Sequence, residues 1–225
     1  MQIDKDEAIS VVLLAGGKGM RMGLSTPKQF LPLQGKPLVF YSLELFLKME
    51  EVTEVVVVCD PSFRPLFSHY AVKFADPGTR RQDSLFNGLQ EVSPTSKWIC
   101  VHDAARPLIT HEMVQTLFQE GRIHGAACLG MPVKWSVKAR TKDNFVQQTV
   151  DRDYLWEIQT PQFLSKKLLM QGFALVQEKK LTVTDDVSLA EHLGHPVKLV
   201  KGAYSNIKIT TPEDLTLAHQ LYPLL

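Results

Sequence analysis

A short apolar run that ends in a cluster of glycines is the feature that most constrains the fold of this chain. Residues Ile9–Leu14 are mostly apolar and rich in β-branched side chains, which is typical of a buried strand in a mainly parallel sheet. Residues 15–19 then read Ala-Gly-Gly-Lys-Gly. Glycine has no Cβ, so backbone N–H groups in such a loop can approach an anion closely. With the cations Arg21 and Lys28 just beyond it, the segment predicts a phosphate site at the end of the first strand.

The loop matches neither of the two commonest phosphate-binding patterns. A P-loop requires Gly-Lys followed by Ser or Thr, but Lys18 is followed by Gly19. A dinucleotide-binding fingerprint requires a small residue where Met22 stands. A glycine-rich turn without a ligand is the alternative, and the cations that follow favour the phosphate site.

The overall composition excludes several classes of protein. The chain has 225 residues, enough for one substantial α/β domain. Its formal net charge is +1, whereas a general nucleic-acid binder carries a strong basic excess. Its apolar stretches are all shorter than a membrane span. We therefore expect neither a nucleic acid nor a membrane as a partner.

The N-terminal residues and the cysteines indicate the compartment. Residues 1–7 are polar and acidic and resemble neither a signal peptide nor a transit peptide. The three cysteines, Cys59, Cys100 and Cys128, lie in or beside apolar runs and match no metal motif, so we interpret them as core thiols. We expect a cytoplasmic bacterial protein, although a trimmed plastid protein would look the same.

Strand patterns alternate with helical patterns along the chain. Apolar strand-like runs recur at 9–14, 54–59, 98–102, 126–131 and 196–200. Helical patterns lie at 37–49, from 83 to 89, and at 111–120, where Thr110 is the expected N-cap and Gly121 the expected end. This alternation predicts an α/β fold with a Rossmann-like, mostly parallel, doubly wound sheet. Ligands of such sheets bind beyond the carboxyl ends of the strands.

Residues 133–150 interrupt the alternation with a β-hairpin pattern. Apolar and polar residues alternate from 133 to 140, a turn is expected at 141–144, and a second strand follows. An isolated hairpin is only marginally stable in water, so this one must pack on something. We favour a second subunit, and an edge hairpin on the same sheet is the alternative. The chain is thus interpreted as a single domain, 1–225, with a dimerisation arm at about 133–152.

Several polar residues lie at expected strand ends and turns. Asp103 follows the predicted strand 98–102, where a carboxylate can bind Mg²⁺ or a sugar hydroxyl. Arg106 can contact a phosphate or pair with a carboxylate of its own fold. Residues 78–84 form a basic turn before a helix, in which Ser84 either contributes to a ligand site or caps the helix.

Three further segments follow towards the C-terminus. Arg152, at the base of the arm, is either solvated or ion-paired, or it reaches a phosphate on another subunit. Residues 184–186 read Thr-Asp-Asp and indicate a helix N-terminus. Lys208 has the position of a basic residue at a strand end, just before a helix that starts at Thr211 with a capping box.

Taken together, these motifs resemble one family. Leu-Ala-Gly-Gly-x-Gly-x-Arg-Met at 14–22 and Pro-Lys-Gln at 27–29 are typical of nucleotidyltransferases that couple an NTP to a phosphorylated sugar or polyol. The match narrows with His-Asp-Ala-Ala-Arg-Pro at 102–107, Val-Asp-Arg at 150–152, Thr-Pro-Gln at 160–162, Thr-Asp-Asp at 184–186 and Asn-Ile-Lys at 206–208. With these, the chain resembles the 2-C-methyl-D-erythritol 4-phosphate cytidylyltransferase family of non-mevalonate isoprenoid biosynthesis.

The resemblance implies a transfer of CMP from CTP to a polyol phosphate, with Mg²⁺ and a homodimer joined by the arm. It implies a catalytic role for Arg21, Lys28 and Lys208. It implies nucleotide contacts from Ala15, Gly16, Gly17, Gly19, Gly78, Ser84, Asp103 and Ala104, with Asp103 also at the metal. It implies that the polyol phosphate meets Ser136, Arg152, Thr160 and Thr184.

Two departures and two alternatives accompany the resemblance. Relatives commonly carry Thr where Ser136 stands, and many bacterial relatives have Asp where this chain has Ser205, so a second carboxylate at the metal is not implied. A cytidylyltransferase for another polyol phosphate, such as ribitol 5-phosphate, would share the CTP loop. A non-catalytic nucleotide-binding regulator would keep the fold, but the joint presence of Arg21, Lys28, Asp103 and Lys208 argues against it.

Overall fold

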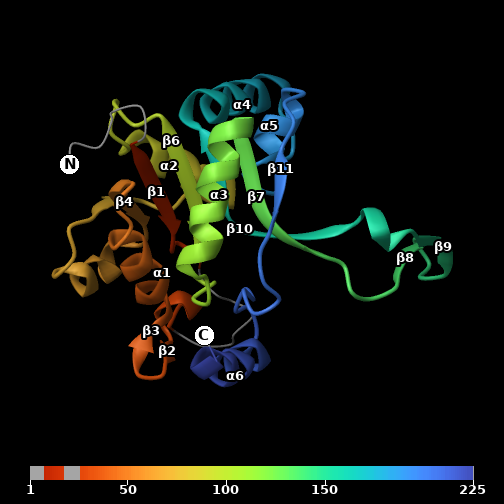
Figure 1. Cartoon of the computed structure of the whole chain (residues 1–225), viewed down its shortest axis with the longest axis horizontal. Helices are drawn as coiled ribbons and strands as arrows, with labels where there is room; N and C mark the ends of the chain where they lie inside the picture. Colours follow the sequence, from red (N-terminus) through yellow and green to blue (C-terminus); the bar gives the residue numbers. More distant parts are fainter. Residues whose placement is uncertain (1–7, 18–25, 225) are drawn as a thin grey trace.

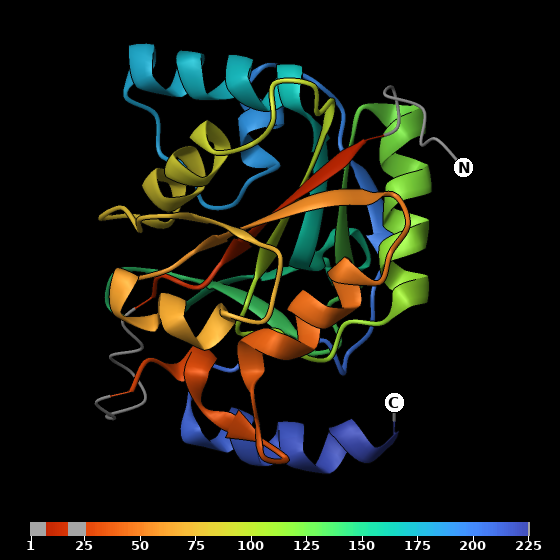
Figure 2. The same ribbon diagram turned by 90° about the vertical axis from the view of Figure 1, so that its left-hand side faces the viewer.

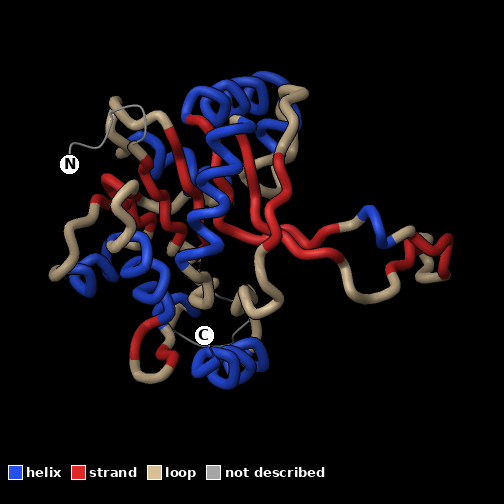
Figure 3. Tube along the Cα trace, in the orientation of Figure 1, coloured by secondary structure: helices blue, strands red, loops and turns tan. Residues whose placement is uncertain are grey.

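A seven-stranded sheet forms the centre of the computed structural model, which describes residues 8–17 and 26–224. The strand order is β11-β7-β10-β6-β1-β4-β5. The strands are β1 (Ile9–Leu14), β4 (Val52–Val58), β5 (Lys73–Ala75), β6 (Trp98–Asp103), β7 (Ala126–Pro132), β10 (Trp156–Ser165) and β11 (Lys198–Lys201). Every strand pair of this sheet is parallel except those of β10, which runs antiparallel to β6 and β7. The strands lie side by side at the centre of the molecule (Figure 3). The predicted mostly parallel sheet is confirmed.

Helices cover both faces of this sheet (Figures 1 and 2). They are α1 (Leu38–Leu47), α2 (Arg81–Gln90), α3 (His111–His124), α4 (Lys166–Lys179) and α5 (Ser188–His192). The last helix, α6 (Pro212–Leu221), lies apart from both faces, beyond one end of the sheet (Figure 2). Successive side chains of β1 point to opposite faces, because a strand alternates with a period of two. Val11 and Leu13 are buried with the apolar residues of α1 and α3, whereas Val12 is buried with those of α2, α4 and α5. The doubly wound layering follows from this alternation.

A small third apolar cluster lies near the carboxyl ends of the parallel strands. It joins α6 to the two-stranded hairpin of β2 (Pro32–Leu33) and β3 (Lys36–Pro37). Leu108 and Ile209 are buried in it, and the Ile209 N–H donates to the Ala105 carbonyl at 2.9 Å. The cluster thereby fixes the C-terminal segment against the loop that follows β6.

The predicted hairpin projects away from the central sheet (Figure 1). Its strands, β8 (Val137–Arg140) and β9 (Val146–Val150), pair only with each other among the described residues. The large apolar side chains of the arm are exposed: Trp135 by 78 %, Phe145 by 72 % and Tyr154 by 85 %. The hairpin is thus not an edge of the main sheet, and packing on a second subunit stays a prediction.

Helix α3 and strand β10 differ from the sequence-based expectation in ways that bear on the site. Helix α3 continues past Gly121 to His124 and ends at Gly125, whose φ of +82° is the left-handed conformation that favours glycine. Gly121 serves packing instead, because an added Cβ there would overlap the Phe163 ring. The long strand β10 was not predicted, since its residues Gln159, Thr160 and Gln162 interrupt the apolar pattern although all three are buried.

Candidate active site

The glycine loop leaves β1 beside a glutamine that holds its backbone. The Gln29 side chain donates from Nε2 to the carbonyls of Ala15, at 2.5 Å, and Gly17, at 2.9 Å. An added Cβ at Gly16 would overlap Pro77, whereas no atom of residues 8–17 or 26–224 is recorded within 4 Å of such an atom at Gly17. Close packing therefore requires glycine at Gly16, whereas the described part of the chain sets no such requirement at Gly17. The predicted site residues Gly19 and Arg21 lie outside the described residues.

A carboxylate lies directly beside this loop. Asp103 ends β6 in register with Leu14 at the end of β1, and the Ala104 N–H donates to the Leu14 carbonyl at 3.0 Å. Asp103 and Ala104 are both buried. The two strand ends thus bring the glycine loop and the carboxylate together, as the parallel sheet predicted.

Two cations hold the Asp103 carboxylate. Arg81, at the start of α2, approaches Oδ1 with Nε at 3.0 Å and Nη2 at 2.9 Å. Lys208 approaches Oδ2 with Nζ at 2.7 Å. Burial alone would raise the pKa of Asp103, but the charges of Arg81 and Lys208 outweigh it and hold that pKa well below its usual range. The carboxylate is therefore ionised at any physiological pH.

Asp186 completes this network from the segment before α5. Its carboxylate accepts from Arg81 Nη1 at 2.5 Å and from Nη2 at 2.9 Å, while Gln162 Oε1 accepts the Asp186 N–H at 2.9 Å. Burial raises the pKa of Asp186, and the Arg81 charge opposes that shift. Burial alone would lower the pKa of Arg81, but the charges of Asp186 and Asp103 outweigh this effect. The pKa of Arg81 is therefore raised overall, and the guanidinium stays charged. Two carboxylates thus fix one arginine between the sheet and α5.

The loop after β6 is tied to the segment that carries Lys208. Arg106 Nη1 donates to the Asn206 carbonyl at 2.7 Å, and Asn206 Nδ2 donates to the Thr160 carbonyl at 3.0 Å. Arg106 is therefore engaged with the backbone of its own fold, which favours the structural interpretation of this residue. Lys208 lies in a loop and not at a strand end, so that expectation was wrong, but the ties place its ammonium at Asp103.

The basic turn before α2 uses Ser84 to hold its own backbone. The Ser84 hydroxyl accepts the Gly78 N–H at 3.0 Å and donates to the Arg80 carbonyl at 3.2 Å. The helix cap is supplied by Asp83, whose carboxylate accepts the Arg80 N–H at 3.0 Å. Ser84 thus shapes the Gly78 turn and does not cap the helix. A nucleotide contact by Gly78 or Ser84 stays a prediction.

The structure brings some of the predicted site residues together and leaves others apart. Lys28 is partly buried at the start of a short 3₁₀ helix, Lys28–Phe30, next to Gln29. Thr160 lies against Asp103, and Thr184 is exposed just before Asp186. Ser136 and Arg152 are exposed on the arm, where Arg152 Nη1 donates to the Lys134 carbonyl at 2.6 Å. Within one chain, the contacts of Arg152 lie in the arm.

Sequence reasoning missed four residues that build the site, namely Gln29, Arg81, Gln162 and Asp186. Arg81 lay in a turn recognised as basic, and Asp186 in a segment interpreted only as a helix start. Gln162 could have been recognised from the sequence, because it lies next to the apolar residues Phe163 and Leu164 and a buried amide needs hydrogen-bond partners. The Arg81–Asp186 ion pair joins residues far apart in the chain and has no local signature.

The donor set fits a divalent cation only partly. Among residues 8–17 and 26–224, no three His, Cys, Asp or Glu side chains gather to hold a metal. Asp103 offers a single ionised carboxylate of the kind that Mg²⁺ prefers, and its oxygens already accept from Arg81 and Lys208. Mg²⁺ commonly binds through one or two carboxylates together with substrate phosphates. The site therefore suits a cation that arrives with a phosphorylated substrate.

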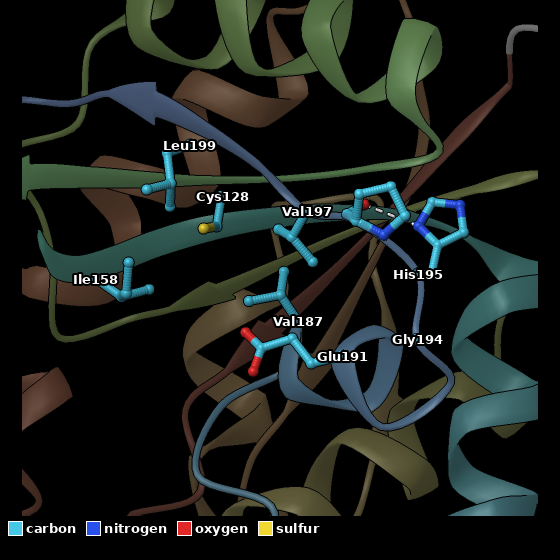
Figure 4. Close-up of a pocket in the computed structure, with 9 residues that line it drawn as sticks. Cys128, Ile158, Val187, Glu191, Gly194, His195, Val197 and Leu199 are labelled. Carbon is cyan, nitrogen blue, oxygen red and sulfur yellow. Dashed lines mark hydrogen bonds between the residues drawn. The ribbon is translucent and has the colours of Figure 1, made fainter. Parts of the chain in front are cut away.

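A separate hollow of about 490 Å³ lies between α5 and the β11 side of the sheet (Figure 4). It is lined largely by apolar side chains, among them Cys128, Val187 and Leu199, with Glu191 at one side. Asp103, Arg81 and Lys208 do not line it. The residues that line it include no lysine or arginine, whereas a triphosphate needs several cationic partners. The glycine loop and Asp103 are the better nucleotide site.

Comparison with known proteins agrees with this geometry. A family model described as 2-C-methyl-D-erythritol 4-phosphate cytidylyltransferase matches residues 9–222. The chloroplastic protein of that name from Oryza sativa subsp. japonica is 50% identical over 223 residues, covering 96% of this chain and 75% of the relative. The protein of that name from Chlamydia pneumoniae is 45% identical over 212 residues, covering 94% of this chain and 98% of the relative.

Solved structures show the same fold. The 4-diphosphocytidyl-2C-methyl-D-erythritol synthase from Anaerococcus prevotii superposes with a TM-score of 0.86 at 29% identity, covering 96% of each chain. The 2-C-methyl-D-erythritol 4-phosphate cytidylyltransferase from Thermus thermophilus superposes with a TM-score of 0.83 at 31% identity, covering 96% of this chain and 99% of the other. Within the described residues, no helix combines the length and apolar character needed to cross a membrane. The chain belongs to the 2-C-methyl-D-erythritol 4-phosphate cytidylyltransferase family.

Proposed function

We propose that this chain transfers CMP from CTP to 2-C-methyl-D-erythritol 4-phosphate and releases pyrophosphate. The product is 4-diphosphocytidyl-2-C-methyl-D-erythritol, an intermediate of non-mevalonate isoprenoid biosynthesis. The observation that carries the proposal is the register of Leu14 with Asp103, which places the glycine loop beside a carboxylate that also holds Lys208. Membership of the cytidylyltransferase family supports the choice of nucleotide.

The reaction needs positioning and charge, and no general base. The acceptor phosphate is already an anionic nucleophile, so it attacks the α-phosphorus of CTP in line while pyrophosphate leaves. Ala15, Gly16, Gly17 and Gly19 surround the triphosphate, with Gly78, Ser84, Asp103 and Ala104 at the rest of the nucleotide. Arg21, Lys28 and Lys208 stabilise the charge that develops in the transition state. Mg²⁺, bound by Asp103 together with the substrate phosphates, would neutralise part of the same charge.

The acceptor is bound between two copies of the chain. The single domain 1–225 dimerises through the arm at 133–152, and the exposed Trp135 and Phe145 supply apolar surface for that contact. Ser136 and Arg152 of the arm then reach the polyol phosphate at the site of the other copy, near Thr160 and Thr184. We place the protein in the cytoplasm, where CTP is available.

An acceptor assay tests the proposal. Pyrophosphate release is measured with CTP and either 2-C-methyl-D-erythritol 4-phosphate or ribitol 5-phosphate. Release with the first acceptor alone supports the proposal, and release with ribitol 5-phosphate alone assigns the chain to another polyol phosphate. Binding of CTP without release for either acceptor identifies a nucleotide-binding regulator.

A further inference from the structure

Two buried side-chain amides hold the loop 202–211, which joins β11 to α6 and contains no helix or strand. Asn206 Nδ2 donates to the Thr160 carbonyl and to Gln159 Oε1, at 3.0 Å in each case. Gln159 Nε2 donates to the Ala203 carbonyl at 2.8 Å. Asn206 and Gln159, which we call the amide pair, therefore join the loop to strand β10 at two points.

The carbonyl at each end fixes the orientation of the amide pair. A carbonyl oxygen only accepts, so Nδ2 of Asn206 must face Thr160, and Nε2 of Gln159 must face Ala203. Oε1 of Gln159 then accepts the second hydrogen of Asn206 Nδ2. Turning either amide over would bring two oxygens together. Asn206 is 0% exposed and Gln159 is 8% exposed, so these hydrogen bonds are made within the protein.

Two further contacts confine the loop on either side of Asn206. Arg106 Nη1 donates to the Asn206 carbonyl at 2.7 Å. An added Cβ at Gly202 would overlap Oε1 of Gln159, so the close approach of the loop to β10 requires glycine there. Lys208 follows Asn206 by two residues, and its ammonium lies at the carboxylate that ends β6. The amide pair therefore determines the place from which the loop presents Lys208.

We propose that Asn206 and Gln159 are positioning residues for the reaction, which hold Lys208 where negative charge develops in the transition state. The proposal rests on the proposed function, in which Lys208 stabilises that charge. A lysine ammonium sits on a flexible four-carbon side chain, so its position depends on how firmly its backbone is held. A charge that is held in place before the reaction is worth more than one that must reorganise during it.

The kinetic test removes the amide pair from each side. Asn206→Ala removes both donated hydrogen bonds and keeps the carbonyl that Arg106 contacts, and Gln159→Met removes the other amide at similar length. We expect each variant to lower kcat about ten- to hundredfold with both KM values nearly unchanged, because a misplacement of about 1 Å can cost about a hundredfold. An unchanged kcat in either variant would overturn the proposal, whether KM stays the same or rises through lost substrate contact.

A double variant shows whether Asn206 acts through Lys208. In a protein that already carries Lys208→Ala, adding Asn206→Ala should lower kcat by less than about twofold, because the group to be positioned is gone. A further loss as large as the one that Asn206→Ala causes alone would show that Asn206 acts on the fold or on another group. That result would overturn the positioning role.

Asn87→Ala is the matched control, because it removes an amide that also donates to a backbone carbonyl. Asn87 Nδ2 donates to the Asp76 carbonyl at 3.0 Å, away from Lys208 and its loop. We expect this variant to leave kcat and both KM values unchanged, and urea unfolding verifies that each assayed protein is folded. A fall in kcat equal to that of Asn206→Ala would reduce the effect to general loss of stability and overturn the proposal.

Hydrogen exchange in the unaltered protein tests the amide pair without any activity. The side-chain amide hydrogens of Asn206 and Gln159 should exchange with solvent more slowly than those of Asn87, because they are buried and hydrogen-bonded. If they do so and the protein releases no pyrophosphate with any acceptor, the proposed function fails while the amide pair stands. Fast exchange in a protein that releases pyrophosphate would overturn the positioning role alone.

Discussion

Lys28 is the only cation between Thr26 and Pro32, and it lies beside the glutamine that holds the glycine loop. We expect Lys28→Ala to lower kcat by a few hundredfold or more, because removing one preorganised charged donor raises the barrier by about 3–4 kcal/mol. Steady-state pyrophosphate release measures the effect. Lys36→Ala is the matched control, since Lys36 pairs with Glu44 at 2.9 Å. Near-normal turnover in a folded Lys28→Ala protein would remove Lys28 from the mechanism.

His102 makes a second prediction, on stability. Its pKa is about 3 in the folded chain because of burial, and about 6.5 in an unfolded chain. The unfolded state therefore takes up a proton at a higher pH, so the contribution is complete above pH 6.5 and declines as the pH falls towards 3. We expect a loss of about 2 kcal/mol at pH 5 from this group, from 1.5 pH units at about 1.4 kcal/mol each.

Urea unfolding at pH 7.5 and pH 5 measures this difference. The free energy of unfolding should fall more in the unaltered protein than in His102→Phe, by the amount attributed to the imidazole. His69 is exposed, so His69→Gln should behave as the unaltered protein does. Equal falls in the unaltered protein and in His102→Phe would show that His102 is not the group responsible.

For single residues, the sequence indicated which side chains belong to the site better than it indicated which side chains contact one another. Asp103 and Lys208 were recognised from their places in motifs, and they lie 2.7 Å apart in the structure. That Arg81 joins both Asp103 and Asp186 could not be read from the chain, because the three residues come from α2, β6 and the segment before α5. Such contacts depend on tertiary packing, which leaves no periodic signal in the sequence.

Helix α3 shows why the end of a helix is harder to predict from sequence than the presence of the helix. Gly121 looks like a helix end, but it lies against Phe163 of β10 and the helix continues. Gly121→Ala should therefore lower the free energy of unfolding by about 1–3 kcal/mol through overpacking, despite the better helix propensity of alanine. Urea denaturation measures the change, and Phe163→Leu in the same chain should recover part of it. A more stable Gly121→Ala protein would contradict the observed contact.

The strands also differ in how easily an apolar sequence pattern reveals them. Four of the predicted parallel strands, at 9–14, 54–59, 98–102 and 126–131, are mainly apolar, because both faces of a parallel sheet are buried, whereas the edge strand β11 is mostly exposed. Strand β10 carries Gln159, Thr160 and Gln162, which are buried only because neighbouring segments supply hydrogen bonds. A pattern-based method therefore identifies the strands of the core and passes over the strand that builds the site.

For the whole molecule, the proposed dimer predicts complementation between two inactive variants. If Lys28 acts in its own subunit and Arg152 in the partner, a heterodimer of Lys28→Ala and Arg152→Ala has one intact site and one doubly altered site. Equal mixing with full exchange should then restore about a quarter of normal activity, because half of the dimers are mixed and each has one working site. Pyrophosphate release after subunit exchange, verified by native mass spectrometry, measures this.

Each variant alone is the control for the mixture. An exchanged mixture that stays as inactive as its components would return Arg152 to its own subunit or exclude it from the reaction. A protein that remains monomeric at assay concentration, yet is active, would remove the dimer from the proposal altogether.

The way in which the arm joins the sheet has an evolutionary consequence. Pro132, where the chain leaves β7, is paired with Trp156, where β10 begins, so the arm is an insertion whose two ends are neighbours. Insertions of this kind change length or sequence at little entropic cost to the body that carries them. If the arm selects the acceptor, substrate range can diversify by exchange of one module while the nucleotide chemistry is inherited unchanged.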